Sequence, residues 1–385
     1  MITSLISSTF RSRDGESFKD AVQKQSGSAG QFYPQLNGLR FVFILMVLIH
    51  HWGPQALFEQ YRIGWVGVDL FYVLSGFLIG EILLREKEIT KSKLRSIRNF
   101  IIRRALRIFP LYYAVVLLYS LLVDDGGILF WNLTYTNNIY QAFHLDQSKE
   151  EFWHIWSLCV EEQFYLFFPF LIFFARPKYL PAILVAGIIM SVVGRVVLIW
   201  FTATPGIHIL MPFCLDSLFI GVLLAYLKIN RPAFLMQLLH NKVRTFAVVT
   251  ASGIGIIALC FANNVISVYG VLRLFGSVGG FFIIGYSVTK GYRGLLKKFL
   301  ENRAAALLGK ISYGIYLIHP FIEKLWYETA DYNIVRNFFI GLQEPIISNR
   351  YVIDFFFLFT ITVAISYLSF NYFEKRFLKL KNLFT

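Results

Sequence analysis

The chain has 385 residues, of which 56% are hydrophobic and only 16% are charged. Soluble domains carry charge on about a quarter of their residues, so this composition excludes an ordinary soluble protein. The net charge of +14 could indicate a nucleic-acid partner, but the basic residues follow a membrane-topology pattern instead. The apolar runs have the length of helices and do not alternate, which predicts an all-α integral membrane protein.

The N-terminal segment differs from the rest of the chain. It is rich in Ser, Gln and Gly, and it contains the basic residues Arg11, Arg13, Lys19 and Lys24. It lacks the apolar core of a signal peptide, so we expect a disordered basic cytoplasmic tail over residues 1–35.

Ten apolar stretches follow this tail, each close to the length of about 20 residues that crosses a bilayer as a helix. The stretches at 101–123 and 306–326 have the clearest boundaries, and TATPG at 202–206 predicts a short turn between the fifth and sixth. We predict a polytopic transmembrane bundle of about ten helices in a single domain at 36–377, with a basic tail at 378–385. The predicted helices are 36–55, 65–84, 101–123, 156–175, 180–202, 208–227, 245–262, 269–289, 306–326 and 351–372.

Lys and Arg concentrate on one side of such a bundle. With the N-terminal tail in the cytoplasm, the segments on that side contain 28 of the 37 basic residues. The outer loops contain only Arg62, Lys149, Arg336 and Arg350. This asymmetry follows the positive-inside rule, and an even number of crossings places both termini in the cytoplasm. We expect a multi-pass protein of a bacterial inner (cytoplasmic) membrane, in contact with membrane lipid.

The first predicted helix carries charge into an apolar run. Its sequence from residue 36, LNGLRFVFILMVLIHHW, has Arg40 near the cytoplasmic end, and His50 and His51 near the outer end. Such groups are costly to bury in lipid and therefore indicate function. Arg40 and His51 are eleven residues apart, so they share one helix face and lie about 16 Å apart along the axis. His50 faces about 100° away.

Three other predicted helices carry titratable side chains to a similar outer depth. Glu161 lies in the fourth helix, His319 in the ninth, and Asp69 near the outer end of the second, with Ser75 about mid-membrane. Unrelated buried groups would not be expected to agree in depth.

Each of these residues also has a structural interpretation. His51 could be a satisfied intramembrane histidine, and Glu161 could form a salt bridge, for example to Arg195. His319 could cap the turn at Pro320. Helix packing is the favoured role for Asp69 and Ser75. The three cysteines are expected to be small buried hydrophobic residues, not disulfide or metal ligands (Cys159, Cys214 and Cys260).

The segment RSIRNFIIRRALRIFPLYY, which leads into the third predicted helix, is strongly basic. An anchor on anionic lipid explains Arg95 and Arg98 well. It explains Arg104 and Arg107 less well, because they continue into the apolar run and share one helix face. Arginine side chains suit phosphate and diphosphate groups, so a phosphorylated cofactor entering from the cytosol would fit here.

Together these sequences resemble the acyltransferase-3 family of polytopic membrane acyltransferases, over about residues 36–377. The resemblance implies an O-acyltransferase of ten or so helices that uses cytoplasmic acyl-CoA, usually acetyl-CoA, as donor. It also implies an acceptor hydroxyl, commonly on a surface or exported glycan or glycolipid. The matching motifs are LNGLR with a histidine eleven residues on, GVDLFYVLSGFLIG, RRALRIFPLYY, WSLCVEEQFYLFFP, LDSLFIGVLLAYL and GKISYGIYLIHP.

The resemblance also assigns residues. The family's arginine and histidine of the first helix fall on Arg40 and His51, its R-x-x-R on Arg104 and Arg107, and its glutamate after W-S-L on Glu161. Tyr165, His319, Asp69 and Ser75 are expected to contact the substrate or to support the site. The sequence departs from the family pattern at Cys159, where a small hydroxyl residue is common, and at Tyr72, where Phe is common.

Acyl transfer to an alcohol requires a base, a stabilised oxyanion and a bound donor. We expect His51 to be the general base, because histidine suits this role near neutral pH, and Glu161 to orient it. An acyl-enzyme on His51 is an alternative route. Arg40, Arg104 and Arg107 would hold the CoA phosphates at the inner face, and no metal is expected. A transporter or flippase with an intramembrane polar site is the alternative function.

Overall fold

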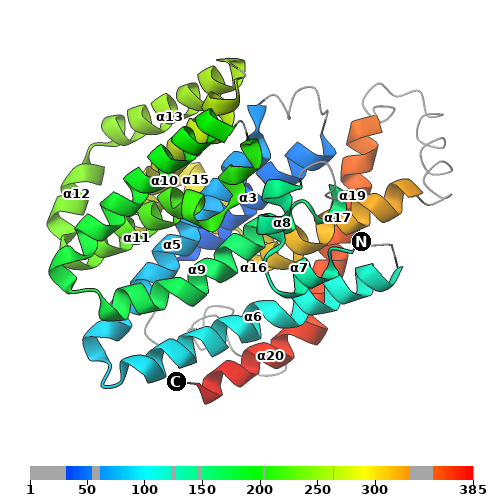
Figure 1. Cartoon of the computed structure of the whole chain (residues 1–385), viewed down its shortest axis with the longest axis horizontal. Helices are drawn as coiled ribbons and strands as arrows, with labels where there is room; N and C mark the ends of the chain where they lie inside the picture. Colours follow the sequence, from blue (N-terminus) through cyan, green and yellow to red (C-terminus); the bar gives the residue numbers. More distant parts are fainter. Residues whose placement is uncertain are drawn as a thin grey trace.

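The computed structural model describes residues 32–53, 61–122, 127–144, 150–202, 204–262, 264–328 and 350–384. These residues form helices and contain no β-strand, which confirms the all-α class (Figure 1). The predicted tail at 1–35 lies almost wholly outside the described residues. Its last two residues are helical, because the first described helix begins at Pro34, and proline is favoured at the first position of a helix.

Every predicted transmembrane stretch coincides with a helix or a helix pair. The long helices are α3 (Pro34–Trp52), α5 (Ile63–Ile89), α6 (Lys93–Leu122), α9 (Ile155–Phe174), α10 (Leu180–Thr202), α11 (Leu215–Asn230), α13 (Lys242–Ala262), α14 (Leu272–Thr289), α17 (Ser312–Glu328) and α19 (Arg350–Ser369). Shorter helices are α7 (Leu129–Leu133), α8 (Asn137–Phe143), α12 (Pro232–His240), α15 (Gly294–Leu300), α16 (Arg303–Lys310) and α20 (Lys375–Leu380).

Within the described residues, eight helices are long and apolar enough to cross a membrane, and α16 with α17 makes a ninth if this bent pair is one crossing. The chain is therefore a multi-pass membrane protein. Helix α3 is not among the nine, since its polar ends lower its mean hydropathy. The count of about ten and the cytoplasmic termini stay predictions.

Two predicted helices differ from the observed ones in shape. The sixth begins only at Leu215, because two 3-10 turns that contain Pro205 and Pro212 precede it. The ninth is bent by 69° at the break between α16 and α17. The predicted C-terminal tail at 378–385 continues as helix α20 and a 3-10 turn to Leu383, which packs against α6 (Figure 1).

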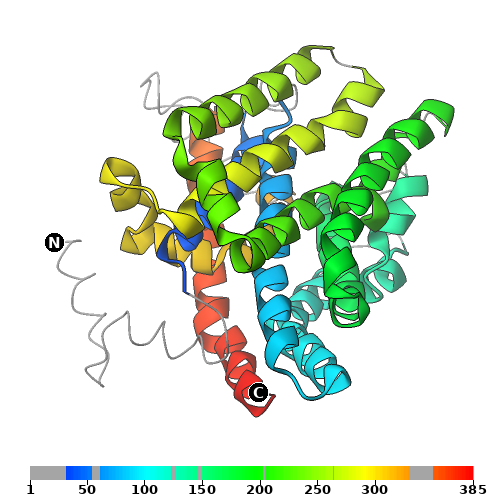
Figure 2. The same cartoon turned by 90° about the vertical axis from the view of Figure 1, so that its left-hand side faces the viewer.

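Helix α5 passes through the middle of the bundle in both views (Figures 1 and 2) and packs against α3, α9, α11 and α14. Its contact with α11 depends on glycine. A Cβ atom at Gly76 would lie 2.0 Å from the carbonyl oxygen of Leu218, and one at Gly221 would lie 2.1 Å from that of Val73. Small residues of this kind allow membrane helices to approach closely.

Ion pairs tie the central helices together. Asp69 of α5 binds Arg273 of α14 at 2.8 Å, and Arg195 of α10 binds Asp216 of α11 at 2.7 Å with both side chains fully buried. At the other end of α5, the Glu81 carboxylate accepts hydrogen bonds from the Tyr33 hydroxyl at 2.7 Å and from Lys228 at 3.0 Å. Burial and the adjacent Glu81 carboxylate raise the pKa of Tyr33 well above its ordinary value, so the phenol stays protonated and donates.

Candidate active site

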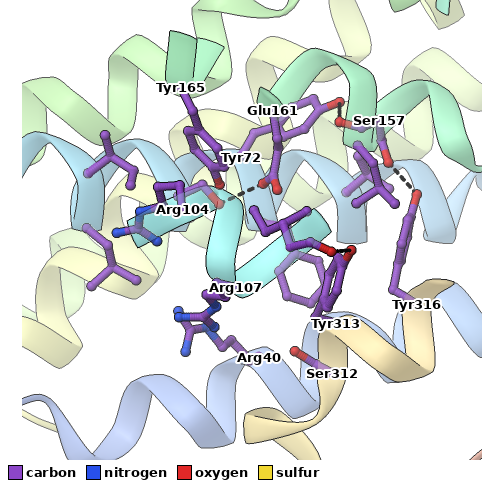
Figure 3. Close-up of a pocket in the computed structure, with 17 residues that line it drawn as sticks. Arg40, Tyr72, Arg104, Arg107, Ser157, Glu161, Tyr165, Ser312, Tyr313 and Tyr316 are labelled. Carbon is purple, nitrogen blue, oxygen red and sulfur yellow. Dashed lines mark hydrogen bonds between the residues drawn. The ribbon is translucent and has the colours of Figure 1, made fainter. Parts of the chain in front are cut away.

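A cavity lies between α3, α5, α6, α9 and α17 (Figure 3). Together with its open mouth, it contains about 790 Å³ of space that no protein atom fills. Its polar lining side chains are Arg40, Tyr72, Ser75, Arg104, Arg107, Ser157, Glu161, Tyr165, Ser312, Tyr313 and Tyr316.

Three arginines converge on this cavity from two helices. Arg40 comes from α3, and Arg104 and Arg107 project one turn apart from α6 (Figure 3). Arg40 donates a hydrogen bond to the side chain of Asn37, and the Arg104 guanidinium lies over the ring of Tyr165 at 5.7 Å. Among the described residues, no carboxylate lies within ion-pairing distance of any of the three. Three cations around one internal cavity, none of them in an ion pair with a described carboxylate, favour an anionic ligand.

Glu161 lies in the same cavity as the arginines. Ser75 Oγ of α5 donates a hydrogen bond of 2.7 Å to the Glu161 carboxylate of α9. The salt bridge to Arg195, considered from the sequence, does not form, because Arg195 binds Asp216 instead. Glu161, Ser75 and Tyr165 therefore join Arg40, Arg104 and Arg107 at one site, although the sequence placed Glu161 nearer to His51.

His51 is not among the residues that line this cavity. Its ring is 4.8 Å from the ring of His319 and 5.5 Å from that of His50, measured between centroids. Tyr316 connects the two regions, since it lines the cavity and its ring is 5.7 Å from that of His319. The structure thus brings His51 together with His319, and Glu161 together with the arginines.

Three further residues near the histidines were not predicted from the sequence. His154, just before α9, is buried with its ring 5.4 Å from that of His319. Ser157 and Tyr316 share a hydrogen bond of 2.6 Å, and the Tyr316 hydroxyl also donates to the His154 carbonyl oxygen at 3.1 Å. His154 lies only two residues before the W-S-L motif, at the outer end of a predicted helix. This position could have indicated that it belongs with the other histidines.

Asp69 does not line the cavity. Its carboxylate accepts from Arg273, which also donates to the carbonyl oxygens of His208 and Phe213. These bonds join α5 and α14 to the 3-10 turns before α11. Asp69 therefore has the helix-packing contacts that the sequence analysis favoured.

Comparison with known proteins identifies the family. The acyltransferase domain of the acyltransferase-3 family matches residues 33–370. The chain belongs to this family. A Staphylococcus aureus (strain COL) protein named as a putative O-acetyltransferase is 26% identical over 380 residues, covering 91% of this chain and 58% of that protein. The O-acetyltransferase OatA of Staphylococcus aureus (strain NCTC 8325 / PS 47) is 27% identical over 330 residues, covering 78% of this chain and 52% of OatA.

The chain spans just over half the length of these curated relatives. No solved structure matches it. The region shared with the acyltransferase-3 family includes every cavity residue named above, together with His51, His154 and His319. It ends at residue 370, so α20 and the turn that follows it lie beyond the shared region. The resemblance inferred from the motifs is confirmed.

Proposed function

We propose that this protein transfers an acyl group, with acetyl favoured, from cytoplasmic acyl-CoA to a hydroxyl of a surface or exported glycan. The observation that carries the proposal is the set of three arginines on one internal cavity of an acyltransferase domain, without carboxylate partners. CoA carries a diphosphate and a phosphate monoester, and guanidinium groups bind such anions by charge-assisted hydrogen bonds.

The donor site in this proposal consists of Arg40, Arg104 and Arg107, which bind the CoA phosphates. The cavity residues fit that role, since guanidinium groups on two helices face one open space and Ser312 adds a hydroxyl. The pantetheine arm spans roughly 15–20 Å when extended, judged by extended-chain reach, so the thioester could react away from the phosphates.

His51 acts as the general base in this proposal. It removes the proton of the acceptor hydroxyl while the hydroxyl oxygen attacks the thioester carbonyl carbon. The tetrahedral intermediate then collapses, its carbon–sulfur bond breaks, and the CoA thiolate takes the proton from His51. His51 as a whole residue is partly exposed.

Glu161 supports the part of the cavity that binds the acyl-CoA donor in this proposal. Its hydrogen bond to Ser75 fixes the carboxylate beside the arginines, where it holds the donor end of the cavity in shape. Direct orientation of His51 by Glu161 would require a rearrangement around Tyr316, which lies between the cavity and His319.

We also propose that the protein lies in a bacterial cytoplasmic membrane with both termini inside, so that the arginines face the CoA pool and the acceptor arrives from outside. Support comes from the distribution of basic residues and from the bacterial relatives.

The decisive experiment incubates the purified, detergent-solubilised protein with radiolabelled acetyl-CoA and a panel of exported bacterial glycans. We expect CoA release that depends on the acceptor and label that appears on the glycan, with both lost in His51→Ala. A transporter would move substrate without releasing CoA, and that result would overturn the proposal. Wild-type rates in a correctly inserted His51→Ala protein would overturn the assignment of the base.

A further inference from the structure

Pro320 determines the hydrogen bonding of His319. In a regular helix the carbonyl oxygen of Tyr316 would accept the backbone N–H of residue 320, but proline has no N–H. His319 Nδ1 lies 2.7 Å from this carbonyl oxygen. A carbonyl can only accept, so Nδ1 carries the hydrogen, and in the neutral ring the lone pair is on Nε2. The dipeptide His319–Pro320 thus selects one tautomer of the histidine.

The Nε2 atom of His319 is buried and has no hydrogen-bond partner among the described residues. The ring itself is fully buried. A buried acceptor without a partner is unfavourable by about 1–3 kcal/mol, so a donor in reach is expected to fill it. Two neighbouring rings could supply an N–H. The buried Nε1–H of Trp52 also has no partner among the described residues, but its ring lies at 6.0 Å, whereas the ring of His51 lies at 4.8 Å.

His154 is held in one tautomer by a second carbonyl group. Its Nε2 lies 3.1 Å from the carbonyl oxygen of Leu317 and must donate, so in the neutral ring the lone pair is on Nδ1. Both His154 and His319 therefore present lone pairs, and α17 supplies both carbonyl groups that fix them. His51 differs from these two residues, because no hydrogen bond to a described residue fixes its tautomer.

We infer that His319 is the positioning residue for His51. Its Nε2 lone pair accepts the N–H of one His51 ring nitrogen, so that the other ring nitrogen carries the lone pair that takes the acceptor proton. His319 gains and loses no proton in this role. An orienting acceptor that fixes the tautomer of a catalytic histidine is the role that a carboxylate has in hydrolase triads, where loss of the correct tautomer costs about 10⁴-fold in rate.

This inference rests on the proposed function, because it concerns the tautomer of the proposed base. The test compares His319→Gln with His319→Asn in the acetyl-CoA assay. Glutamine places its carbonyl oxygen near the position of Nε2 and keeps an acceptor for His51. Asparagine places its amide near the position of Nδ1, so it keeps the bond to Tyr316 and loses the acceptor.

We expect His319→Gln to retain kcat within about tenfold of wild type, and His319→Asn to lose about 10²-fold in kcat, the lower end of typical acid–base contributions. Neither change should alter the KM for acetyl-CoA. If His319→Asn is as active as His319→Gln, or more active, His319 only caps the helix and the inference is overturned. Wild-type rates in His51→Ala would instead overturn the assignment of His51 as the base, and a wild-type protein that releases no CoA would overturn the proposed function.

Pro320→Ala gives a second test that leaves His319 in place. The change restores a backbone N–H that competes for the Tyr316 carbonyl oxygen, so His319 is no longer held in one tautomer. We expect kcat to fall several-fold with an unchanged donor KM, although alanine favours the helix. Unchanged kcat in this variant would overturn the inference. His50→Gln serves as the matched control, because the ring of His50 also neighbours that of His51, at 5.5 Å, and the kcat of this variant should stay near wild type.

Discussion

The Ser75 hydroxyl donates a 2.7 Å hydrogen bond to the carboxylate of Glu161 on the wall of a cavity that Arg104 and Arg107 also line. The carboxylate and the two guanidinium groups share this space, yet they do not come within the 4 Å of an ion pair. A collapsed salt bridge would fill the cavity. Because none forms, the arginines stay available to an anionic ligand, and the carboxylate limits how much positive charge that ligand must neutralise.

The first prediction concerns donor binding. Arg104→Ala and Arg107→Ala should each raise the KM for acetyl-CoA by about 10- to 100-fold, the equivalent of one charge-assisted hydrogen bond. Their kcat values should change less, because the phosphates do not react. Arg98→Ala is the matched control, since Arg98 is exposed on the same helix and does not line the cavity. An unchanged KM in both arginine variants would place the CoA site elsewhere.

The second prediction concerns Glu161 and Ser75. Glu161→Gln keeps an acceptor for Ser75 and removes a negative charge from a cationic cavity. The KM for the anionic donor should therefore stay equal or fall, while kcat should drop by at least tenfold if the carboxylate holds the site in its reactive shape. Ser75→Ala removes one hydrogen bond to a charged group and should lower kcat less, by about fivefold. A higher donor KM in Glu161→Gln would contradict this arrangement.

The sequence predicted the helices well because a bilayer sets their length. Every stretch of about 20 apolar residues became a helix, including the broken pair at 306–326. Arg40, Arg104 and Arg107 were also predicted to act together, and they do line one cavity. Charged side chains in a bundle face its interior, so residues placed at one depth on neighbouring helices meet there.

The depth of Glu161 was predicted less well. Glu161 is six residues from the start of α9, about 9 Å along the axis, whereas Ser75 is twelve residues from the start of α5, about 18 Å. The two side chains nevertheless touch, so α9 begins about 9 Å deeper in the bundle than α5 does. Counting residues from helix ends assumes that the ends are level. The buried His154 just before α9 shows that this end lies inside the protein.

The pairing of His51 with His319 also depends on geometry that spacing does not contain. The Tyr316 carbonyl oxygen, which receives no backbone N–H from Pro320, holds Nδ1 of the His319 ring. The dipeptide His319–Pro320 is visible in the sequence. The ring neighbours of His319, however, come from α3 and from the start of α9. Contacts between such distant segments follow only from the packed structure.

The third prediction tests the glycine contact between α5 and α11. Gly76→Ala places a Cβ atom 2.0 Å from a backbone oxygen, so the helices must separate, and we expect a loss of about 1–3 kcal/mol in stability. Gly253→Ala on α13 is the matched control, because its Cβ would meet open space and alanine favours the helix. Thermal unfolding in detergent should show a lower Tm only for Gly76→Ala. Equal Tm values would mean that α5 and α11 are not in close contact.

The fourth prediction concerns the buried pair Arg195–Asp216, whose 2.7 Å contact is fully enclosed between α10 and α11. Asp216→Ala leaves the guanidinium buried with only the carbonyl oxygens of Gly270 and Phe213, so it should destabilise the protein by about 3–5 kcal/mol.

The double variant Arg195→Leu with Asp216→Leu should be less destabilised than either single change to leucine, because no unpaired charge remains. Lys324→Ala removes a partly exposed lysine from its 3.5 Å contact with the buried Glu151, and it should cost less than Asp216→Ala because one of its two charged groups is in contact with solvent. Denaturation of the five variants in one detergent (Asp216→Ala, Arg195→Leu, Asp216→Leu, the double variant and Lys324→Ala) measures the differences. A double variant that is as unstable as the sum of its single changes would mean that the two charges act independently, contrary to the direct contact.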